Sequence, residues 1–160
     1  MPAKTPKLID IIICDDIRRE ANTNKLFIIG MYTGAVVVNS VPAKLPTFSI
    51  LIKWRTEDDS PVAGTLRIES PSKKVLQSID IDMSDAPGTK PDWAEDSHLA
   101  VIINAHNFQL PELGRYRLMF KPQKGRARKL STFIVIQGEV TPSLGKTRRT
   151  PTPAMNALGR

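Results

Sequence analysis

Hydrophobic and polar residues alternate along most of this chain, which is the pattern expected of strands that bury one face. The alternation is clear between residues 113 and 138, where Tyr116, Leu118 and Phe120 alternate with a second row that contains Arg115, Arg117 and Lys121. A polar connection containing Gly125 follows, and the alternation then resumes. Two such runs joined by a short segment with one glycine predict an antiparallel hairpin.

The hairpin opens with the spacing Gly114-x-Tyr116. In β-sandwich domains, a tyrosine near the start of a central strand often bonds through its hydroxyl back to the backbone. The spacing therefore favours a sandwich.

Seven more segments have the pattern of strands, which brings the predicted total to about nine. They are residues 8–14, 25–32, 35–39, 47–55, 64–70, 75–82 and 99–105. Residues 25–32 are apolar on both faces and are therefore predicted to form a central strand, and residues 99–105 a buried one. Strands at this spacing, with no long segment of helical period, predict an all-β antiparallel sandwich of Ig-like or C2-like type.

The pattern divides the chain into three parts. Residues 1–7 are predicted to be a flexible lead-in, residues 8–140 the sandwich domain and residues 141–160 a disordered basic tail. Within the domain, residues 84–98 form a long irregular loop, which contains Trp93. Loops of this length in compact domains are often functional or disordered.

The net charge of +7 changes this picture little once it is located. Residues 1–7 and 141–160 carry six basic residues and no acidic ones, so 17 basic and 16 acidic residues remain between them. The predicted domain is therefore close to neutral. The exception is a basic cluster at the tip of the late hairpin, made of Lys121, Lys124, Arg126, Arg128 and Lys129.

The single cysteine, Cys14, excludes an intramolecular disulfide and suits a reducing compartment. The sequence has neither the pattern of a secretory signal nor a run of about 20 apolar residues that could span a membrane. A cytoplasmic protein that does not contact membranes is expected.

Four segments resemble a bacterial family of small β proteins classed only as a domain of unknown function. They are ICDDIRRE (13–20), KLFIIGMYTG (25–34), LPTFSILIKWR (45–55) and LPELGRYRLMF (110–120). The family pattern is a CDxIRxE segment, a KxxxIGxY strand and a late GxY strand. It is matched by Cys14, Asp15, Ile17, Arg18 and Glu20, then Lys25, Ile29, Gly30 and Tyr32, then Gly114 and Tyr116. The resemblance covers about residues 8–138 and implies no catalytic residues or cofactor.

The first candidates for chemistry are the adjacent carboxylates of Asp15 and Asp16. Neighbouring residues of a strand point to opposite faces, which argues against an acid–base pair. We favour a structural role, in which Asp15, Arg18 and Glu20 tie the end of a strand to a turn.

A metal site is the next possibility. Asp80, Asp82 and Asp85 lie near a loop that carries further acids, and carboxylates on the end loops of a sandwich can bind Ca²⁺. The spacing is not that of an EF-hand, and His98 and His106 have no zinc-site spacing. Cys14 is interpreted as a small core residue. We predict no metal, cofactor or catalytic residue, and no enzyme activity.

Contact with a partner is the remaining possibility, and the candidate residues are Trp93, Lys124, Arg126, Arg128 and Lys129. The basic cluster could neutralise phosphates, or it could keep an exposed hairpin soluble, and the second interpretation is favoured because the nearby aromatic residues face inward. Trp93 either packs onto the sandwich, which is favoured, or anchors a partner.

The sequence thus predicts a non-catalytic binding or scaffold module, with a protein as the expected partner. The alternative is a nucleic-acid-associated accessory protein that uses the basic tip and tail. The identity of the partner stays open, and so does the possibility of a homo-oligomer.

Overall fold

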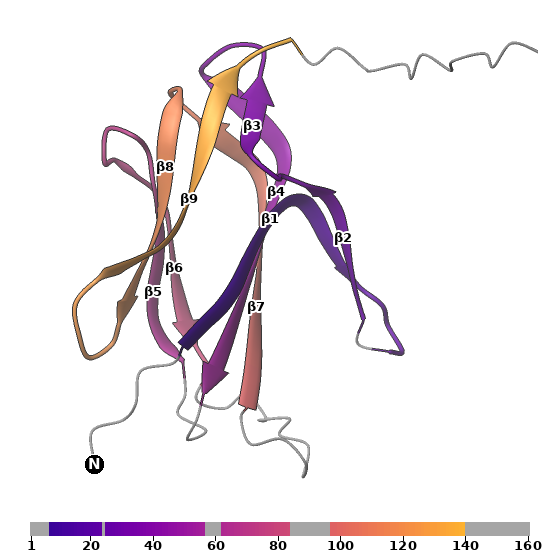
Figure 1. Ribbon diagram of the computed structural model, residues 1–160, viewed down its shortest axis with the longest axis vertical. Helices are drawn as coiled ribbons and strands as arrows, with labels where there is room; N and C mark the ends of the chain where they lie inside the picture. The colour runs from indigo at the N-terminus through magenta and orange to yellow at the C-terminus, as the bar shows by residue number, and fades with distance from the viewer. Residues whose placement is uncertain (1–6, 24, 57–61, 84–96, 140–160) are drawn as a thin grey trace, which may run out of the picture.

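The computed structural model describes residues 7–23, 25–56, 62–83 and 97–139 (Figure 1). These residues form nine β-strands and no helix. The strands are β1 (Lys7–Arg19), β2 (Leu26–Met31), β3 (Ala35–Val38), β4 (Ala43–Thr56), β5 (Ala63–Glu69), β6 (Val75–Asp82), β7 (Ser97–Leu110), β8 (Gly114–Pro122) and β9 (Arg128–Gln137). The predicted all-β sandwich is confirmed.

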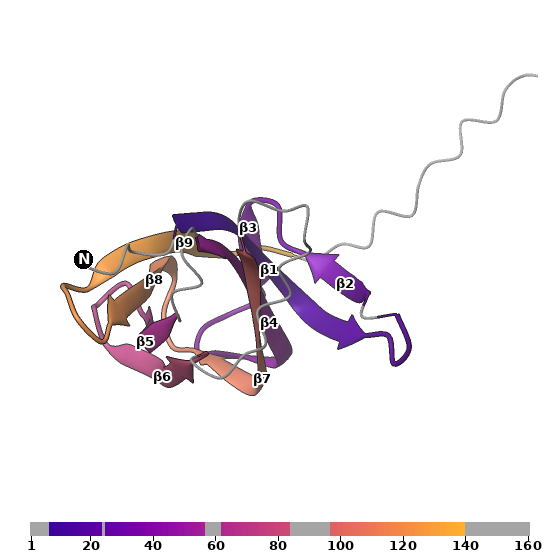
Figure 2. The ribbon, with the colours of Figure 1, turned by 90° about the horizontal axis from the view of Figure 1, so that it is seen from below.

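The strands form two sheets that pack face to face (Figure 2). The first sheet has the order β2-β1-β4-β7, and the second has the order β3-β9-β8-β5-β6. Neighbouring strands are antiparallel, except that β3 runs parallel to β9. The chain crosses from the first sheet to the second between β2 and β3, so these two consecutive strands are edge strands of different sheets.

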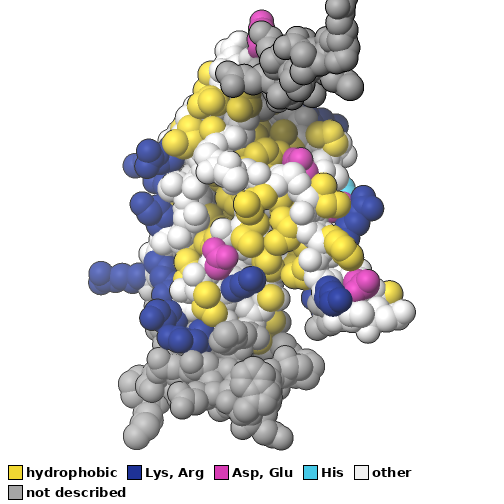
Figure 3. All heavy atoms as spheres, turned by 45° about the vertical axis from the view of Figure 1, so that its right-hand side comes forward, with side chains coloured by type: hydrophobic (Ala, Val, Ile, Leu, Met, Phe, Trp, Pro, Cys, Tyr) yellow, Lys and Arg dark blue, Asp and Glu magenta, His cyan; other side chains and the backbone are white. Residues whose placement is uncertain are grey.

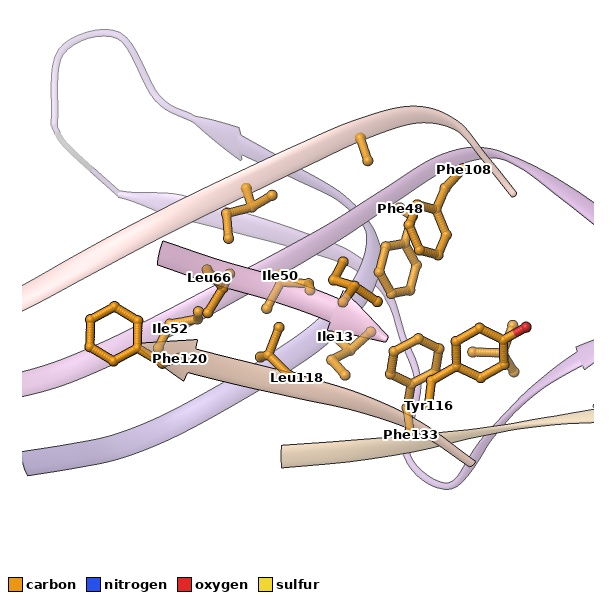
Figure 4. Close-up of a cluster of buried hydrophobic side chains, with 14 of the residues drawn as sticks. Ile13, Phe48, Ile50, Ile52, Leu66, Phe108, Tyr116, Leu118, Phe120 and Phe133 are labelled. Atoms are coloured by element: carbon orange, nitrogen blue, oxygen red, sulfur yellow. The ribbon is translucent and has the colours of Figure 1, made fainter. Parts of the chain in front are cut away.

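The core lies between the sheets, as the alternating patterns predict. Phe48, Ile50 and Ile52 project from β4 toward the aromatic and aliphatic side chains of β8 and β9 (Figure 4). Trp54, on the same strand, is buried with its ring centroid 5.7 Å from that of Phe120 on β8. The ring centroids of Phe48 and Phe108 lie 4.6 Å apart in a stacked pair. Burying one such side chain stabilises the fold by about 1.5–3 kcal/mol, so this layer holds the two sheets together.

The predicted tyrosine corner is present at the start of β8. Tyr116 is fully buried, and its hydroxyl donates a hydrogen bond of 2.7 Å to the carbonyl oxygen of Glu112. The Glu112 carboxylate in turn accepts bonds from the backbone N–H (3.1 Å) and hydroxyl (2.6 Å) of Ser72. The corner therefore joins the β7–β8 connection to the turn between β5 and β6.

Several strands are longer than predicted. β1 was expected to end at Cys14, but it continues through the polar segment Asp15–Arg19, because these residues pair with β2. Lys7, expected in the lead-in, is the first residue of β1. β7 extends well past the predicted residues 99–105, and it lies at a sheet edge with Asn104 and His106 exposed, so the prediction of a buried strand is wrong.

The prediction for residues 25–32 is also wrong. They were expected to form a central strand because both faces are apolar, but β2 is an edge strand, bonded to β1 alone. β1 takes the position beside β4, and the short connection between β1 and β2 places β2 outside it. The apolar faces of β2 are consequently not covered by the body of the domain.

Candidate functional site

β2 and the second half of β1 form a two-stranded hairpin that projects from the sandwich (Figures 1 and 2). We call this hairpin, residues 14–23 and 25–32, the arm. Its pairs are continuous from Arg19 opposite Leu26 to Asp16 opposite Ile29, and they are interrupted at Gly30 before Cys14 lies opposite Met31. At the tip, the backbone N–H of Glu20 donates to the carbonyl of Lys25 at 2.9 Å.

The apolar side chains of β2 are open to solvent. Phe27 is 56% exposed, Ile28 38%, Ile29 45% and Met31 56%. Because side chains alternate along a strand, Phe27 and Ile29 lie on one face and Ile28 on the other. Figure 3, which turns this side of the molecule forward, shows hydrophobic side chains gathered on the surface. Both faces of β2 are therefore apolar and accessible.

An exposed strand edge is normally protected by charges, proline, shortness or a bulge, because its unpaired backbone groups are a template for another strand. The other edges of this sandwich follow that rule. β6 presents Ser78, Asp80 and Asp82 to solvent, β3 has four residues, and β7 exposes polar side chains. β2 does not follow the rule. Among the strands described here, it is an edge strand of six residues that contains no charged residue and no proline.

The base of the arm is anchored by a small apolar cluster on the first sheet. Cys14, Ile17 and Leu51 are buried together, and Leu26 packs against them. Burial, together with the charges of Asp15 and Asp16, raises the pKa of the Cys14 thiol. The interpretation of Cys14 as a small buried residue is confirmed.

A polar contact also fixes the arm. The hydroxyl of Tyr32 donates a hydrogen bond to the Asp15 carboxylate, and the backbone N–H of Tyr32 donates to the Ile13 carbonyl at 2.9 Å. Gly30, two residues before Tyr32, has a φ of 65°. A side chain at this position would collide with the Asp15 carboxylate. Both the backbone conformation and the contact with Asp15 therefore favour glycine at this position.

The two adjacent carboxylates have different partners. Asp16 accepts a bond of 2.8 Å from Arg18, whose hydrogen bond lowers the pKa of Asp16, whereas Asp15 is bound by Tyr32. Glu20 accepts a bond from Thr23 at the tip. These contacts agree with the structural role expected for Asp15, Arg18 and Glu20, although Arg18 pairs with Asp16 and not with Asp15.

The predicted basic cluster lies where the sequence places it, at the tip between β8 and β9. Lys121, Lys124, Arg126 and Lys129 are exposed, whereas Arg128 is half-buried and already makes an interaction within the protein. Trp93 lies outside the described residues, so the cluster and Trp93 are not placed relative to each other.

The metal candidates are only partly described. Asp80 accepts a hydrogen bond of 2.8 Å from the Thr65 hydroxyl, and Asp82 lies nearby on the wet face of β6. Asp85 and the side chain of His98 lie outside the described residues. Within the part of the chain that is described, no group of three or more His, Cys, Asp or Glu side chains is placed to hold a metal ion.

A hollow of about 440 Å³ lies over β5, β6 and β8. Arg67 and Lys121 line it from one side, and Asp80 and Asp82 from the other. Its walls are thus polar and of mixed charge, in contrast to the apolar arm.

Within the described ranges, the fold and the arm define a β-sandwich whose edge strand β2 is apolar and carries neither charge nor proline. Residues 10–127 match DUF6941, a family of unknown function, and the chain belongs to this family. The match includes the arm and the core strands β4 to β8. No curated protein sequence matches the chain. Among the described residues, no helix is long and apolar enough to cross a membrane.

Proposed function

We propose that this protein is a non-catalytic protein-binding module, and that its partner docks on strand β2. The observation that carries the proposal is the exposure of a six-residue apolar strand whose outer edge has no partner among the described residues. Monomeric proteins rarely leave such an edge open, since it promotes uncontrolled association.

The geometry of β2 suits strand addition, in which an extended segment of the partner continues the sheet. Hydrogen-bonded pairs alternate along an antiparallel ladder. The bond between Glu20 and Lys25 at the tip assigns Lys25 to the set that faces β1. The bond from Tyr32 to Ile13 belongs to the opposite set, so we place a change of alternation at Gly30, where the pairing with Asp15 is interrupted, and apply the tip pattern to the residues before Gly30. Leu26 and Ile28 alternate with Lys25, Phe27 and Ile29. Their backbone N–H and C=O groups therefore point away from β1, toward the incoming strand.

Backbone bonds would provide the affinity of this contact, and the alternate side chains its selectivity. The exposed side chains of β2 select an apolar segment, because cross-strand aromatic and β-branched pairs stabilise a sheet by about 0.2–1 kcal/mol each. Asp15 and Asp16 are held by separate partners within the arm, which supports a structural and not a catalytic role for them. The unpaired, buried Cys14 supports a reducing, cytoplasmic setting.

We interpret the scaffold that carries the arm as Ig-like. β4 and β7 pair in one sheet, as strands B and E do in immunoglobulin-type domains, and β5, β8 and β9 have the order of C, F and G. The tyrosine corner falls on the F-like strand β8. The fold alone does not specify a function, so the proposal rests on the arm.

Site-specific photocrosslinking in the cells that make this protein tests the proposal. A photoreactive amino acid replaces Phe27 in the arm or, as a control, Val75, an exposed apolar residue of β6. We expect protein adducts from position 27 and few from position 75. Equal yields at both positions, or no adduct at position 27, would contradict a docking role for β2.

Nucleic-acid binding is the second candidate, and the exposed cations at the β8–β9 tip favour it. Arg115 and Arg67 extend this positive charge over the outer face of the same sheet. We rank this function lower because Tyr116, Phe120 and Phe133, the aromatic residues of these strands, are buried and cannot stack on bases.

A further inference from the structure

We propose that the strand that pairs with β2 is β2 of a second copy of the chain. Two arms would pair antiparallel about a two-fold axis, and the two four-stranded sheets would become one continuous sheet of eight strands. This inference rests on the proposed docking role of β2 and names the partner for it.

The register of the pairing follows from the outward backbone groups. Since the N–H and C=O of Ile28 point to the free edge, the two-fold axis passes beside this residue, and Ile28 of one copy forms a hydrogen-bonded pair with Ile28 of the other. Phe27 then lies opposite Ile29 of the second copy. Both residues project from the same face of their strand, as an antiparallel pair requires.

The charges near the edge are compatible with this pairing. Residues 14–32 contain three acidic residues, Asp15, Asp16 and Glu20, and three basic ones, so the arm is neutral although the whole chain carries +7. In the proposed register Lys25 lies opposite Met31, so no two like charges face each other across the new ladder. A partner with strong opposite charge would find little to recognise here, whereas an identical neutral arm meets no repulsion.

The arrangement also ends at two copies. Pairing about a two-fold axis covers the free edge of β2 in both copies. The outer strand at each side of the joined sheet is then β7. β7 exposes Asn104, His106 and Gln109, and it carries an irregularity at Asn107, whose φ is 56°. Such edges resist further pairing. Because the arm projects beyond the body, two sandwiches can approach edge to edge (Figure 2).

A symmetric disulfide tests the register. In a hydrogen-bonded antiparallel pair the Cα atoms are about 5.5 Å apart, which lies inside the range of roughly 4.4–6.8 Å that a disulfide spans. The Cβ atoms of such a pair are about 5 Å apart, so the two strands must approach by up to about 1 Å for the bond to form. Under mild oxidation, Ile28→Cys is expected to form a covalent dimer. The controls are the wild type, whose Cys14 is buried, and Ile9→Cys, which is 48% exposed on β1 outside the arm. Both controls are expected to remain single chains.

Light scattering on the purified wild-type protein tests the association itself. We expect a mass twice that of the 17.8 kDa chain, decreasing on dilution. Ile28→Lys would place two like charges opposite each other in the dimer and is expected to weaken association at least about tenfold. Ile28→Val, which keeps the β-branched side chain and adds no charge, should associate like the wild type. Equal melting temperatures of the wild type and both variants, measured at a concentration where single chains predominate, exclude misfolding as the cause.

The outcomes separate this inference from the proposed function. A wild-type chain that stays single up to about 100 micromolar overturns the pairing of two copies, as does equal disulfide formation by Ile9→Cys. If photocrosslinks at position 27 then reach a different protein, the docking role of β2 stands with another partner. If they reach no protein, both proposals fail. Adducts of twice the chain mass, lost in Ile28→Lys, support both.

Discussion

The arm and the hairpin of β8 and β9 are both antiparallel pairs of strands with a short connection, but they differ in where their apolar side chains lie. In the β8–β9 hairpin, Tyr116, Leu118 and Phe120 all point into the core and are almost fully buried. In the arm, the apolar side chains of β2 remain largely exposed. The charges are distributed in the opposite sense, since the arm is neutral and the β8–β9 tip is basic.

The two hairpins should therefore contribute differently to the stability of a single chain. A hairpin whose side chains fill the core is bound to the fold, and its tip is free to carry charge for solubility. A hairpin whose side chains miss the core contributes little to the stability of a single copy, so its apolar composition needs another physical reason. Burial against a partner is such a reason, and it predicts that the two hairpins respond differently to the same substitution.

The largest contrast is expected between two phenylalanines. Phe133 is 6% exposed, stacks on Tyr116 at 5.0 Å and contacts Phe48, so Phe133→Ala should cost about 3–5 kcal/mol of unfolding free energy. Phe27→Ala should change it by no more than about 0.5 kcal/mol in dilute protein. Urea denaturation at a concentration where single chains predominate measures both. Equal losses would show that the arm packs onto the body of the domain.

The two tyrosines of the chain allow a pH test, because one lies in each hairpin. Burial raises the pKa of both, and at Tyr32 the hydrogen bond to Asp15 raises it further. The unfolded chain loses these protons at a pH of about 10, whereas the folded protein retains them. The contribution of these two tyrosines to stability should therefore be constant below that pH and decrease above it.

Absorbance of tyrosinate, followed together with unfolding, measures this dependence. Tyrosinate should form as the protein unfolds and not before. Tyr32→Phe should reduce the alkaline loss, and Tyr116→Phe should in addition cost about 1–3 kcal/mol at neutral pH, since Glu112 loses its bond partner. A tyrosine that ionises at its ordinary pH in the folded protein would mean that the base of the arm is open to water.

The basic tip is expected to give a smaller effect. Replacing Lys124, Arg126 and Lys129 by Gln should lower solubility and leave self-association unchanged. Neither the wild type nor this triple variant should bind duplex DNA detectably at physiological salt. A matched control replaces Lys44, Lys73 and Lys74, three exposed cations elsewhere on the surface.

Salt-dependent binding would reverse the ranking of the two functions. Each phosphate contact contributes a log–log slope of about −0.9 on duplex DNA. If the tip binds phosphates, the triple substitution should flatten the slope by roughly two to three units, whereas the control triple should not.

The smallest effect is expected from the tail. Residues 141–160 contain few large apolar side chains, and β9 already ends at Gln137. A chain that stops at residue 140 should melt within about one or two degrees of the full chain and associate equally well. A large drop in melting temperature would place the tail on the sandwich and make the domain boundary at residue 140 wrong.

Much of the fold could be predicted where one face of a strand is buried and the other is wet. The inward row of Phe48, Ile50, Ile52 and Trp54 alternates with Thr47, Ser49, Lys53 and Arg55, broken only by the apolar Leu51, and the sequence shows it. The tyrosine corner was also predictable, because Tyr116 bonds to a residue four positions earlier. Local signals of this kind do not depend on the partner strand.

What could not be predicted depends on pairing. The segment Asp15–Arg19 is polar and has the composition of a turn, but it is a strand because β2 lies beside it. The apolar residues of β2 predict burial, but the pattern of a strand does not specify whether the same chain or a partner would supply the covering surface. A useful signal was available, since residues 26–31 carry no charge and end beside Gly30, where a central strand would be interrupted.

The parallel pairing of β3 with β9 has a consequence for mechanical load. The chain enters the sandwich at one end through β1 and leaves at the opposite end through β9 (Figure 1). A pull on the two chain ends therefore runs along the strands and loads the β3–β9 pair in shear. Its four residue pairs, from Ala35 with Ile134 to Val38 with Gln137, would have to break together and not one after another. A short edge strand thus resists stretching of the domain more than its length suggests.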